Sequence, residues 1–132
     1  LRSLSRQRHC ALLLITHDLA VVRWMCARVL VMYAGRILEA GPPAELFQHP
    51  AHPYTAALVA AVPTLAARRA SAARLRLAPD RERLAEAPPG CVLAGRCPRA
   101  VARCWEERPS GRELAPARWS ACHFAEEMLA PR

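Results

Sequence analysis

The chain has 132 residues, enough for about one domain with a modest hydrophobic core. Its composition is 53% hydrophobic but only 5% aromatic, and all 19 basic residues are arginine, which gives a formal net charge of +8. The arginines are scattered and form no basic tail, so we expect a solvated arginine-rich surface and no nucleic-acid partner. No apolar stretch approaches the roughly 20 residues that a membrane-spanning helix needs, so we predict that the chain does not cross a bilayer.

The first predicted elements are a strand and a helix. Residues 11–15, "ALLLI", form a continuous apolar run, which is typical of a central parallel strand buried on both faces. Asp18 is placed to cap a following helix, in which Val22 and Cys26 recur at helical spacing on the apolar side. Cys26 and Cys10 are both predicted to be small core residues.

A β-hairpin and two short helices are predicted next. The runs "RVLVMY" and "RILEA" flank a tight turn at Ala34–Gly35, so residues 29–40 indicate a hairpin. Pro43 suits the first turn of a short helix that ends near Phe47. The segment "PYTAALVAAV" predicts a second helix, which Pro63 would end.

The remainder of the chain changes composition twice. Residues 64–89 are rich in alanine, arginine and proline with little apolar periodicity, and they are interpreted as a linker. Four of the six cysteines fall between positions 91 and 122, so residues 90–132 are expected to form a separate small Cys-rich module of irregular structure.

His17 stands where the apolar run ends and the helix is predicted to begin. In open α/β sheets, ligands bind beyond the carboxyl ends of the strands. A neutral imidazole at that point can hydrogen-bond to a phosphate oxygen or a water. A lone histidine after a strand is more often structural than catalytic, so the residues alone do not assign a phosphate-binding role to His17.

The sequence of the whole segment favours a phosphate-binding role for His17. "LLLITHDLAVVRWMCARVLVMYAGRILEAGPPAELFQHP" closely resembles the switch-histidine region of ATP-binding cassette (ABC) transporter ATPases. The resemblance implies an α/β fold in which residues 1–48 form the C-terminal part of a P-loop ATPase nucleotide-binding domain. It also implies that His17 contacts the γ-phosphate of ATP, bound with Mg²⁺, and helps to orient the attacking water, whereas Asp18 caps and orients.

Most of the other sequence motifs of that family are absent from the chain. It contains no G-x-x-x-x-G-K-[ST] loop (Walker A), no lysine, no acidic residue at the end of a preceding apolar strand (Walker B), and no Ser-Gly signature. We therefore expect this chain alone to be inactive as an ATPase. Because it also begins without methionine, we interpret it as a C-terminal fragment of a longer subunit.

A second resemblance narrows the family. "HPAHPYTAALVAAVP", residues 49–63, looks like the helical extension of the ATPase subunits that power dipeptide, oligopeptide and some nickel importers. Pro53 fixes the entry to that helix, and Tyr54 has an apolar body and a polar tip suited to docking it. His52 is expected to pack or to cap the helix rather than to bind a ligand.

That resemblance also implies partners and a location. The partners are integral-membrane permease subunits, a second ATPase subunit and, indirectly, an extracytoplasmic substrate-binding protein. The location is peripheral, on the cytoplasmic face of the plasma (inner) membrane. Whether dipeptides, oligopeptides or nickel are transported stays open.

Residues 90–132, called the tail below, contain four cysteines, which are separated by five, six and seventeen residues. They are Cys91, Cys97, Cys104 and Cys122. Paired C-x-x-C knuckles are absent, so the spacing names no metal. Two disulfides, simple buried thiols and a four-thiolate metal site are the alternatives, and we prefer the metal site because a cytosolic compartment is reducing.

The tail resembles the cysteine-rich end of the same importer subunits, which looks like an iron–sulfur ligand set. The resemblance implies a [4Fe–4S] cluster on these four cysteines. From the residues alone, Zn²⁺ is the alternative metal, and His123, next to Cys122, is an alternative ligand. Such a site would stabilise a segment that is too small to fold on its own core.

Two other functions are compatible with the residues. One is a freestanding four-cysteine metal-binding module that holds nucleic acid on its arginine-rich surface, with an affinity that falls steeply with salt. The other is a nonfunctional remnant of the ATPase.

Overall fold

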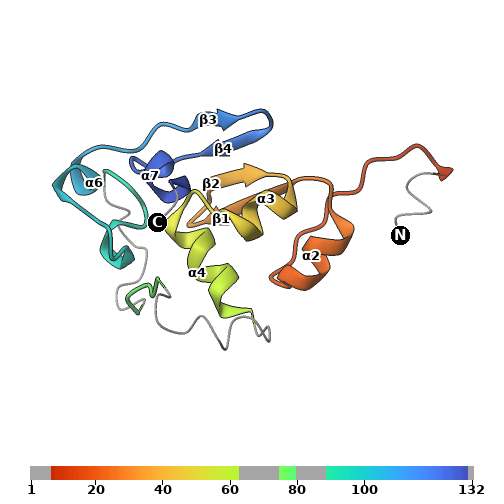
Figure 1. The fold of residues 1–132 in the computed structure, drawn as a ribbon, viewed down its shortest axis with the longest axis horizontal. Helices are drawn as coiled ribbons and strands as arrows, with labels where there is room; N and C mark the ends of the chain where they lie inside the picture. Colours follow the sequence, from red (N-terminus) through yellow and green to blue (C-terminus); the bar gives the residue numbers. More distant parts are fainter. Residues whose placement is uncertain (1–6, 63–74, 80–88, 131–132) are drawn as a thin grey trace.

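The fold is built on one four-stranded sheet, seen in a computed structural model that describes residues 7–62, 75–79 and 89–130. In Figure 1 the sheet lies across the centre of the molecule, helices α3 and α4 lie on one side of it, and α2 and α6 lie at opposite ends. The elements in chain order are α2 (Leu19–Met25), β1 (Val29–Tyr33), β2 (Arg36–Gly41), α3 (Pro43–Gln48), α4 (Pro53–Ala61), the 3₁₀ helix η2 (Ala94–Arg96), α6 (Ala102–Glu106), β3 (Arg112–Ala115), β4 (Arg118–Ser120) and α7 (Ala125–Leu129).

Helix α2 begins at the cap that the sequence predicts. The Asp18 carboxylate accepts hydrogen bonds from the backbone amides of Ala20 at 2.9 Å and Val21 at 3.2 Å, and so satisfies two amides of the first turn. Val22 is the buried residue of this helix. The predicted helix and its capping residue are confirmed.

The hairpin β1–β2 and the two helices after it are also confirmed. Ala34 and Gly35 both have positive φ, 48° and 72°, which a tight two-residue hairpin turn requires. Pro43 occupies the first turn of α3, and Pro53 occupies the first turn of α4. Pro63, the predicted end of the second helix, lies outside the described residues.

Tyr54 docks α4 onto the hairpin. Its ring packs against that of Tyr33 on β1, with ring centroids 4.9 Å apart. The Arg96 guanidinium lies 5.7 Å from the centre of the Tyr33 ring and donates to its hydroxyl at 3.3 Å. The docking role expected for Tyr54 is therefore seen in the structure.

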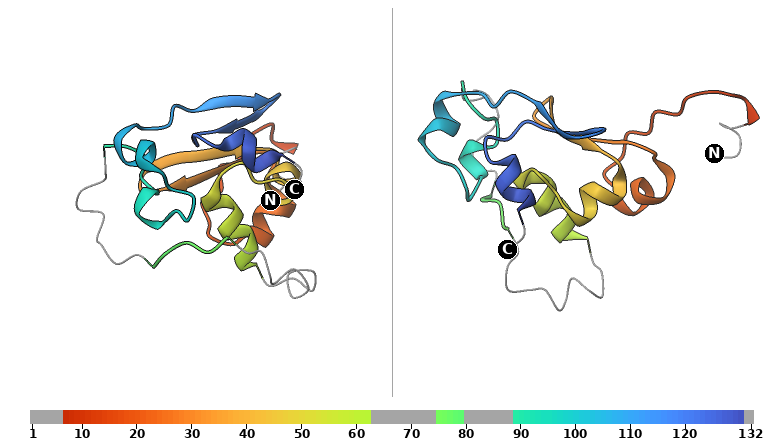
Figure 2. Two further views of the ribbon diagram at one scale, coloured as in Figure 1. Left: turned by 60° about the vertical axis from the view of Figure 1, so that its left-hand side comes forward. Right: turned by 45° about the horizontal axis from the view of Figure 1, so that its top comes forward.

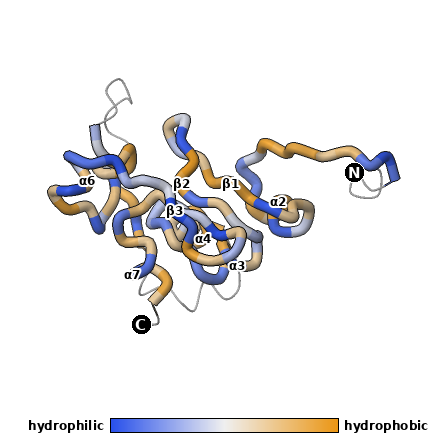
Figure 3. The backbone as a smooth tube through the Cα atoms, turned by 90° about the horizontal axis from the view of Figure 1, so that it is seen from above, coloured by the Kyte–Doolittle hydropathy of each residue, from blue (hydrophilic) through white to orange (hydrophobic). Residues whose placement is uncertain are grey.

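The predicted strand at residues 11–15 is wrong. These residues form an extended arm without strand pairing, in which the side chains of Leu13 and Ile15 are 81% and 90% exposed. In Figure 3 the arm is the hydrophobic stretch that projects beside α2. A central strand needs a neighbour on each edge to satisfy its amides and carbonyls, and no described strand lies beside this segment. Cys10, at the start of the arm, is exposed rather than part of a core.

The tail is not a separate module, because it completes the sheet. The strand order is β1-β2-β4-β3, and every neighbouring pair is antiparallel. Ser120 and Trp119 of β4 lie opposite Glu39 and Ala40 of β2. The two views of Figure 2 show the tail hairpin running alongside the first. The change of composition near residue 90 thus marks where the cysteines begin, not where a folding unit begins.

A small core lies where the tail meets the segment before α4. Ala51, Cys122 and Ala125 are buried against one another, and Phe124 and Leu129 pack around them. The predicted linker, residues 64–89, falls outside the described residues except for 75–79 and 89. The Ala78 amide donates to the Arg96 carbonyl, and Nε of the Arg96 side chain donates to the Ala78 carbonyl. In the part of the chain that the structure describes, no helix is long and apolar enough to cross a membrane.

Candidate functional site

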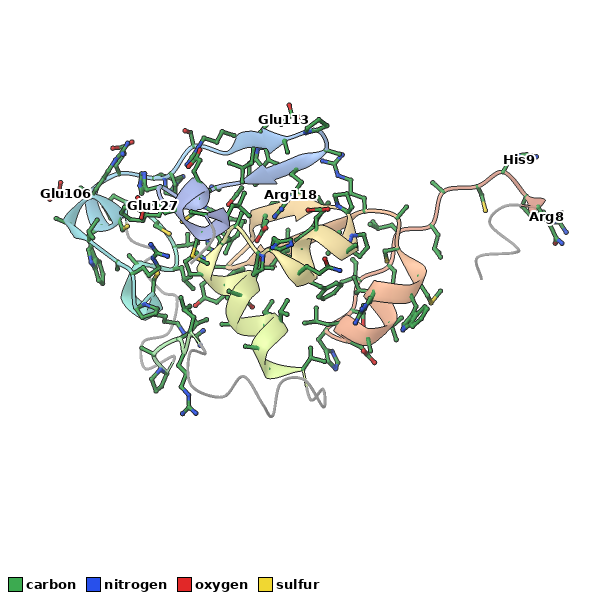
Figure 4. The ribbon with its side chains drawn as sticks, viewed as in Figure 1. Arg8, His9, Glu106, Glu113, Arg118 and Glu127 are labelled. Atoms are coloured by element: carbon green, nitrogen blue, oxygen red, sulfur yellow. The ribbon has the colours of Figure 1, made fainter. Side chains whose placement is uncertain are left out.

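The four cysteines of the tail meet at one cavity. Cys91 precedes η2, Cys97 ends it, Cys104 lies in α6, and Cys122 follows β4. All four line a cavity of about 20 Å³, which is roughly the room that one water molecule takes. Figure 4 shows sulfur atoms gathered next to α6 and α7. The fold therefore brings together four thiols that the sequence spreads over 32 residues.

Burial sets the protonation of these thiols. Burial raises the pKa of Cys91 and of Cys97, and it raises the pKa of Cys122 to about 11. The neighbouring thiols, Cys104 among them, raise these pKa values further, because several thiolates would repel one another. The thiols of Cys91, Cys97 and Cys122 are therefore protonated at neutral pH, and a cation bound by them would displace their protons.

Backbone amides are arranged to offset thiolate charge. For three of the cysteines, the amide two residues further along the chain hydrogen-bonds the sulfur and lowers the pKa of that thiol. The pairs are Leu93 with Cys91, Arg99 with Cys97, and Phe124 with Cys122. Amide donors of this kind hold ligand atoms in place and stabilise their charge, which suits sulfur ligands of a metal.

The side chains are not yet in a coordinating arrangement. Within residues 7–62, 75–79 and 89–130, no three His, Cys, Asp or Glu side chains are placed to hold a metal ion together. The cavity has room for a single ion, whereas a cluster would need the cysteine-bearing loops to move apart. Four cysteine sulfurs are the type of ligand that a thiophilic metal prefers. Their positions are those of a closed cavity and not those of ligands around a bound metal.

Two histidines also line this cavity. His123 is fixed by its Nε2 atom, which lies 3.0 Å from the carbonyl oxygen of Glu107. His52 is only 1% exposed, and its Nδ1 atom accepts a hydrogen bond from the Tyr54 amide at 3.1 Å, which confirms that it caps α4. Burial lowers the pKa of His52 to about 4, so its ring is neutral. Sequence reasoning found the cap but missed the cavity, because the cysteines follow His52 at a distance of 39 residues or more.

His17 lies far from this cavity. It is exposed in the bend that precedes α2. Helix α2 lies at the end of the molecule opposite α6 (Figure 1). The Thr16 hydroxyl accepts a hydrogen bond from the Asp18 amide at 3.0 Å and holds this bend. The chain thus presents two separated candidate sites, an exposed histidine at one end and a cysteine cavity at the other.

A buried ion pair, which sequence reasoning missed, connects the two hairpins. Arg118 donates to Glu39 at 3.2 Å and to the backbone carbonyl of His49 at 2.6 Å. In Figure 4, Arg118 lies below β4 and is directed toward α3 and α4. Glu39 also accepts from the Ala51 amide at 2.8 Å. Glu39 is a charged residue inside the predicted apolar strand "RILEA". Because a charged side chain is buried only when it is paired, this position could have indicated a buried partner.

Other arginines of the tail are paired with carboxylates on its surface. The pairs are Arg99 with Glu127, Arg103 with Glu107, and Arg112 with Glu126. This internal pairing offsets much of the positive charge that a nucleic-acid surface would need.

Comparison with known proteins identifies the family. Residues 38–104, about half of the chain, match the family described as oligopeptide/dipeptide transporter, C-terminal region. The dipeptide transport ATP-binding protein DppD of Escherichia coli is 41% identical over 134 residues, covering 94% of this chain and 37% of that protein. A putative peptide import ATP-binding protein of Brucella ovis is 41% identical over 122 residues, covering 92% of this chain and 38% of that protein. A probable peptide ABC transporter ATP-binding protein of Sinorhizobium fredii is 43% identical over 120 residues, covering 90% and 35%.

These relatives share one class, since all three are named as ATP-binding proteins of peptide transport or import. The chain belongs to the oligopeptide/dipeptide transporter C-terminal-region family. It spans little more than a third of the length of the relatives it matches.

Proposed function

We propose that the chain is part of the ATP-binding subunit of an ABC importer that uses ATP hydrolysis to energise the uptake of di- or oligopeptides. The observation that carries this proposal is the family match over residues 38–104. The names of the relatives support peptides as the transported class. The same proposal gives the subunit its partners: permease subunits in the membrane, a second ATP-binding subunit and a substrate-binding protein outside. Its place is on the cytoplasmic face of the inner membrane.

In this proposal His17 contacts the γ-phosphate of ATP bound with Mg²⁺. Its exposure supports the role, because an accessible imidazole can meet a nucleotide held by another part of the subunit. The capped bend from Thr16 to Asp18 supports it as well, since the backbone on both sides of His17 is held. The chain has no phosphate-binding loop, so the remaining nucleotide contacts belong to the additional length that the relatives possess.

Transport by the complete subunit tests this proposal. The full-length subunit that carries this chain is reconstituted with its permeases in proteoliposomes, and ATP hydrolysis and peptide uptake are measured. We expect His17→Ala to lower hydrolysis by roughly 10²-fold, the usual cost of losing one group that stabilises the transition state. His9→Ala, at another exposed histidine, is the matched control. Unchanged hydrolysis in His17→Ala contradicts the role of His17, and nickel uptake without peptide uptake corrects the substrate.

We further propose that Cys91, Cys97, Cys104 and Cys122 hold a [4Fe–4S] cluster, with Zn²⁺ as the alternative. Their convergence on one cavity and the amides directed at their sulfurs support this. When bound, the metal group supplies cross-links between loops. The cysteines would then tie η2, α6 and the segment after β4 to one another, in a part of the chain with few large buried side chains.

Metal analysis after anaerobic purification tests the second proposal. We expect about four iron and four sulfide per chain for a [4Fe–4S] cluster, and about one zinc for the alternative. Cys104→Ser should abolish the metal, whereas Cys26→Ser, outside the cavity, should leave it in place. A wild-type protein with neither iron nor zinc contradicts the proposal.

A further inference from the structure

His52 lines the cysteine cavity and carries a buried nitrogen that takes no part in capping α4. Its Nδ1 atom accepts from the Tyr54 amide at 3.1 Å and caps α4. Its Nε2 atom is buried and has no hydrogen-bond partner among the described residues. The ring lines the cavity. Nε2 is separated from Nδ1 by one ring carbon, so a single ring can serve two partners.

The cap fixes which nitrogen carries the proton. An atom that accepts a hydrogen bond has no proton of its own, so Nδ1 is the unprotonated nitrogen. A buried imidazole without a charged partner is neutral, because an unpaired charge is costly in apolar surroundings. The single ring proton therefore lies on Nε2, which makes that atom a donor and not a metal ligand.

The other polar side chains at the cavity have partners elsewhere. His123 uses Nε2 on the carbonyl oxygen of Glu107. Arg99 directs its guanidinium to Glu127 and to the sulfur of Met128, each at 3.1 Å. Of the non-cysteine side chains that line the cavity, His52 alone has a buried polar atom that lacks a partner within the described part of the chain.

We infer that His52 is a positioning residue: when the cysteines bind a metal, its Nε2–H group donates a hydrogen bond to a ligand sulfur while its Nδ1 atom caps α4. The inference rests on the proposed four-cysteine metal site. A donor to ligand sulfur draws off negative charge, so it raises the reduction potential of an iron–sulfur cluster, and it strengthens the hold on zinc. One side chain would thus couple the start of helix α4 to the metal.

Two substitutions separate the two duties of the ring. His52→Asn keeps an oxygen at the place of Nδ1, where asparagine is a favoured cap, and removes the reach of Nε2. His52→Gln keeps a donor at about the reach of Nε2 and loses the cap. The two variants and the wild type are purified anaerobically and assayed for iron, sulfide, zinc, thermal stability and, by potentiometric titration, reduction potential.

The inference predicts opposite responses. With a cluster bound, His52→Asn should lower the reduction potential with little loss of stability, while His52→Gln should keep the wild-type potential and unfold at a lower temperature. With zinc bound, His52→Asn should weaken zinc binding by about 10- to 100-fold, and His52→Gln should not.

Two results would contradict the inference, and they can be told apart. Metal bound with the same potential or zinc affinity in His52→Asn and wild type overturns the inference and leaves the metal site standing. A wild-type chain that holds neither iron nor zinc overturns the metal site and the inference with it.

Discussion

Arg118 and Glu39 are joined across the sheet although 79 residues separate them in the sequence. Nη2 of Arg118 lies 3.2 Å from Oε1 of Glu39, and the two side chains are only 7% and 1% exposed. The same guanidinium reaches the carbonyl of His49, and the same carboxylate accepts from the amide of Ala51. This pair therefore fixes β4, β2 and the turn before α4 relative to one another.

Removing the cation of this pair should destabilise the fold strongly. We expect Arg118→Met to lower the free energy of unfolding by about 3–5 kcal/mol, because Glu39 would stay buried without its charged partner. Urea denaturation followed by circular dichroism measures the change. The control is Arg103→Met, whose exposed pair with Glu107 should leave the urea midpoint almost unchanged. Equal midpoints in the two variants would show that the buried pair does not hold the sheet together.

The same pair gives stability a particular dependence on pH. Burial raises the pKa of Glu39, and the Thr55 hydroxyl, the Ala51 amide and Arg118 lower it only in part. Because the folded protein binds this proton more tightly than the unfolded chain, the contribution is fully present below the unfolded pKa of about 4.5 and is lost as pH rises through the folded pKa. We therefore expect Glu39→Gln to flatten the fall in urea midpoint above about pH 4.5. A wild type and variant with parallel pH profiles would contradict this.

Local signals in the sequence predicted the hairpin and three helices correctly. These signals depend only on neighbouring residues, so they can be recognised without knowing the tertiary structure. They are the cap at Asp18, the turn at Ala34–Gly35 and the helix start at Pro43. The strand at residues 11–15 was predicted wrongly, because an apolar run shows that a segment favours burial and does not show which strands lie beside it.

Long-range pairing explains the other differences. Strand β4 has only three residues, "RWS", too few to show an alternating pattern, and its partner β2 lies far back in the chain. The clustering of cysteines could be read from the sequence, and so could the cap at His52. Their meeting at one cavity depends on the docking of α4 against the tail, which no local pattern reports.

Gly90 should be needed to close the cysteine cavity. A Cβ at this position would lie 2.3 Å from the backbone carbonyl oxygen of Cys104, and backbone cannot move aside as a side chain can. The adjacent Cys91 amide donates to that same oxygen at 2.7 Å, so the two cysteine segments must approach closely. We expect Gly90→Ala to cost about 1–3 kcal/mol and to lower metal retention.

Gly95 provides the matched control for this prediction. A Cβ there would lie 3.5 Å from the Trp105 ring, which is an ordinary contact. Gly95→Ala should therefore keep both stability and metal. Urea denaturation and metal analysis compare the two variants. Equal urea midpoints and equal metal content in Gly90→Ala and Gly95→Ala would mean that the close backbone approach at Gly90 is not required.

The exposed apolar arm should make this chain associate with itself in solution. Leu13 and Ile15 carry most of their surface in water, and Met32 on the edge strand β1 is 59% exposed. Contact between such surfaces removes apolar area from water at about 25 cal/mol per Å². We expect sedimentation velocity to show association that increases with concentration, and Leu13→Glu combined with Ile15→Glu to reduce it. Arg8→Glu, an exposed change in the same arm that alters charge without removing apolar surface, should not have the same effect. A wild-type chain that sediments as a monomer at high concentration would mean that the arm is covered by contacts of its own.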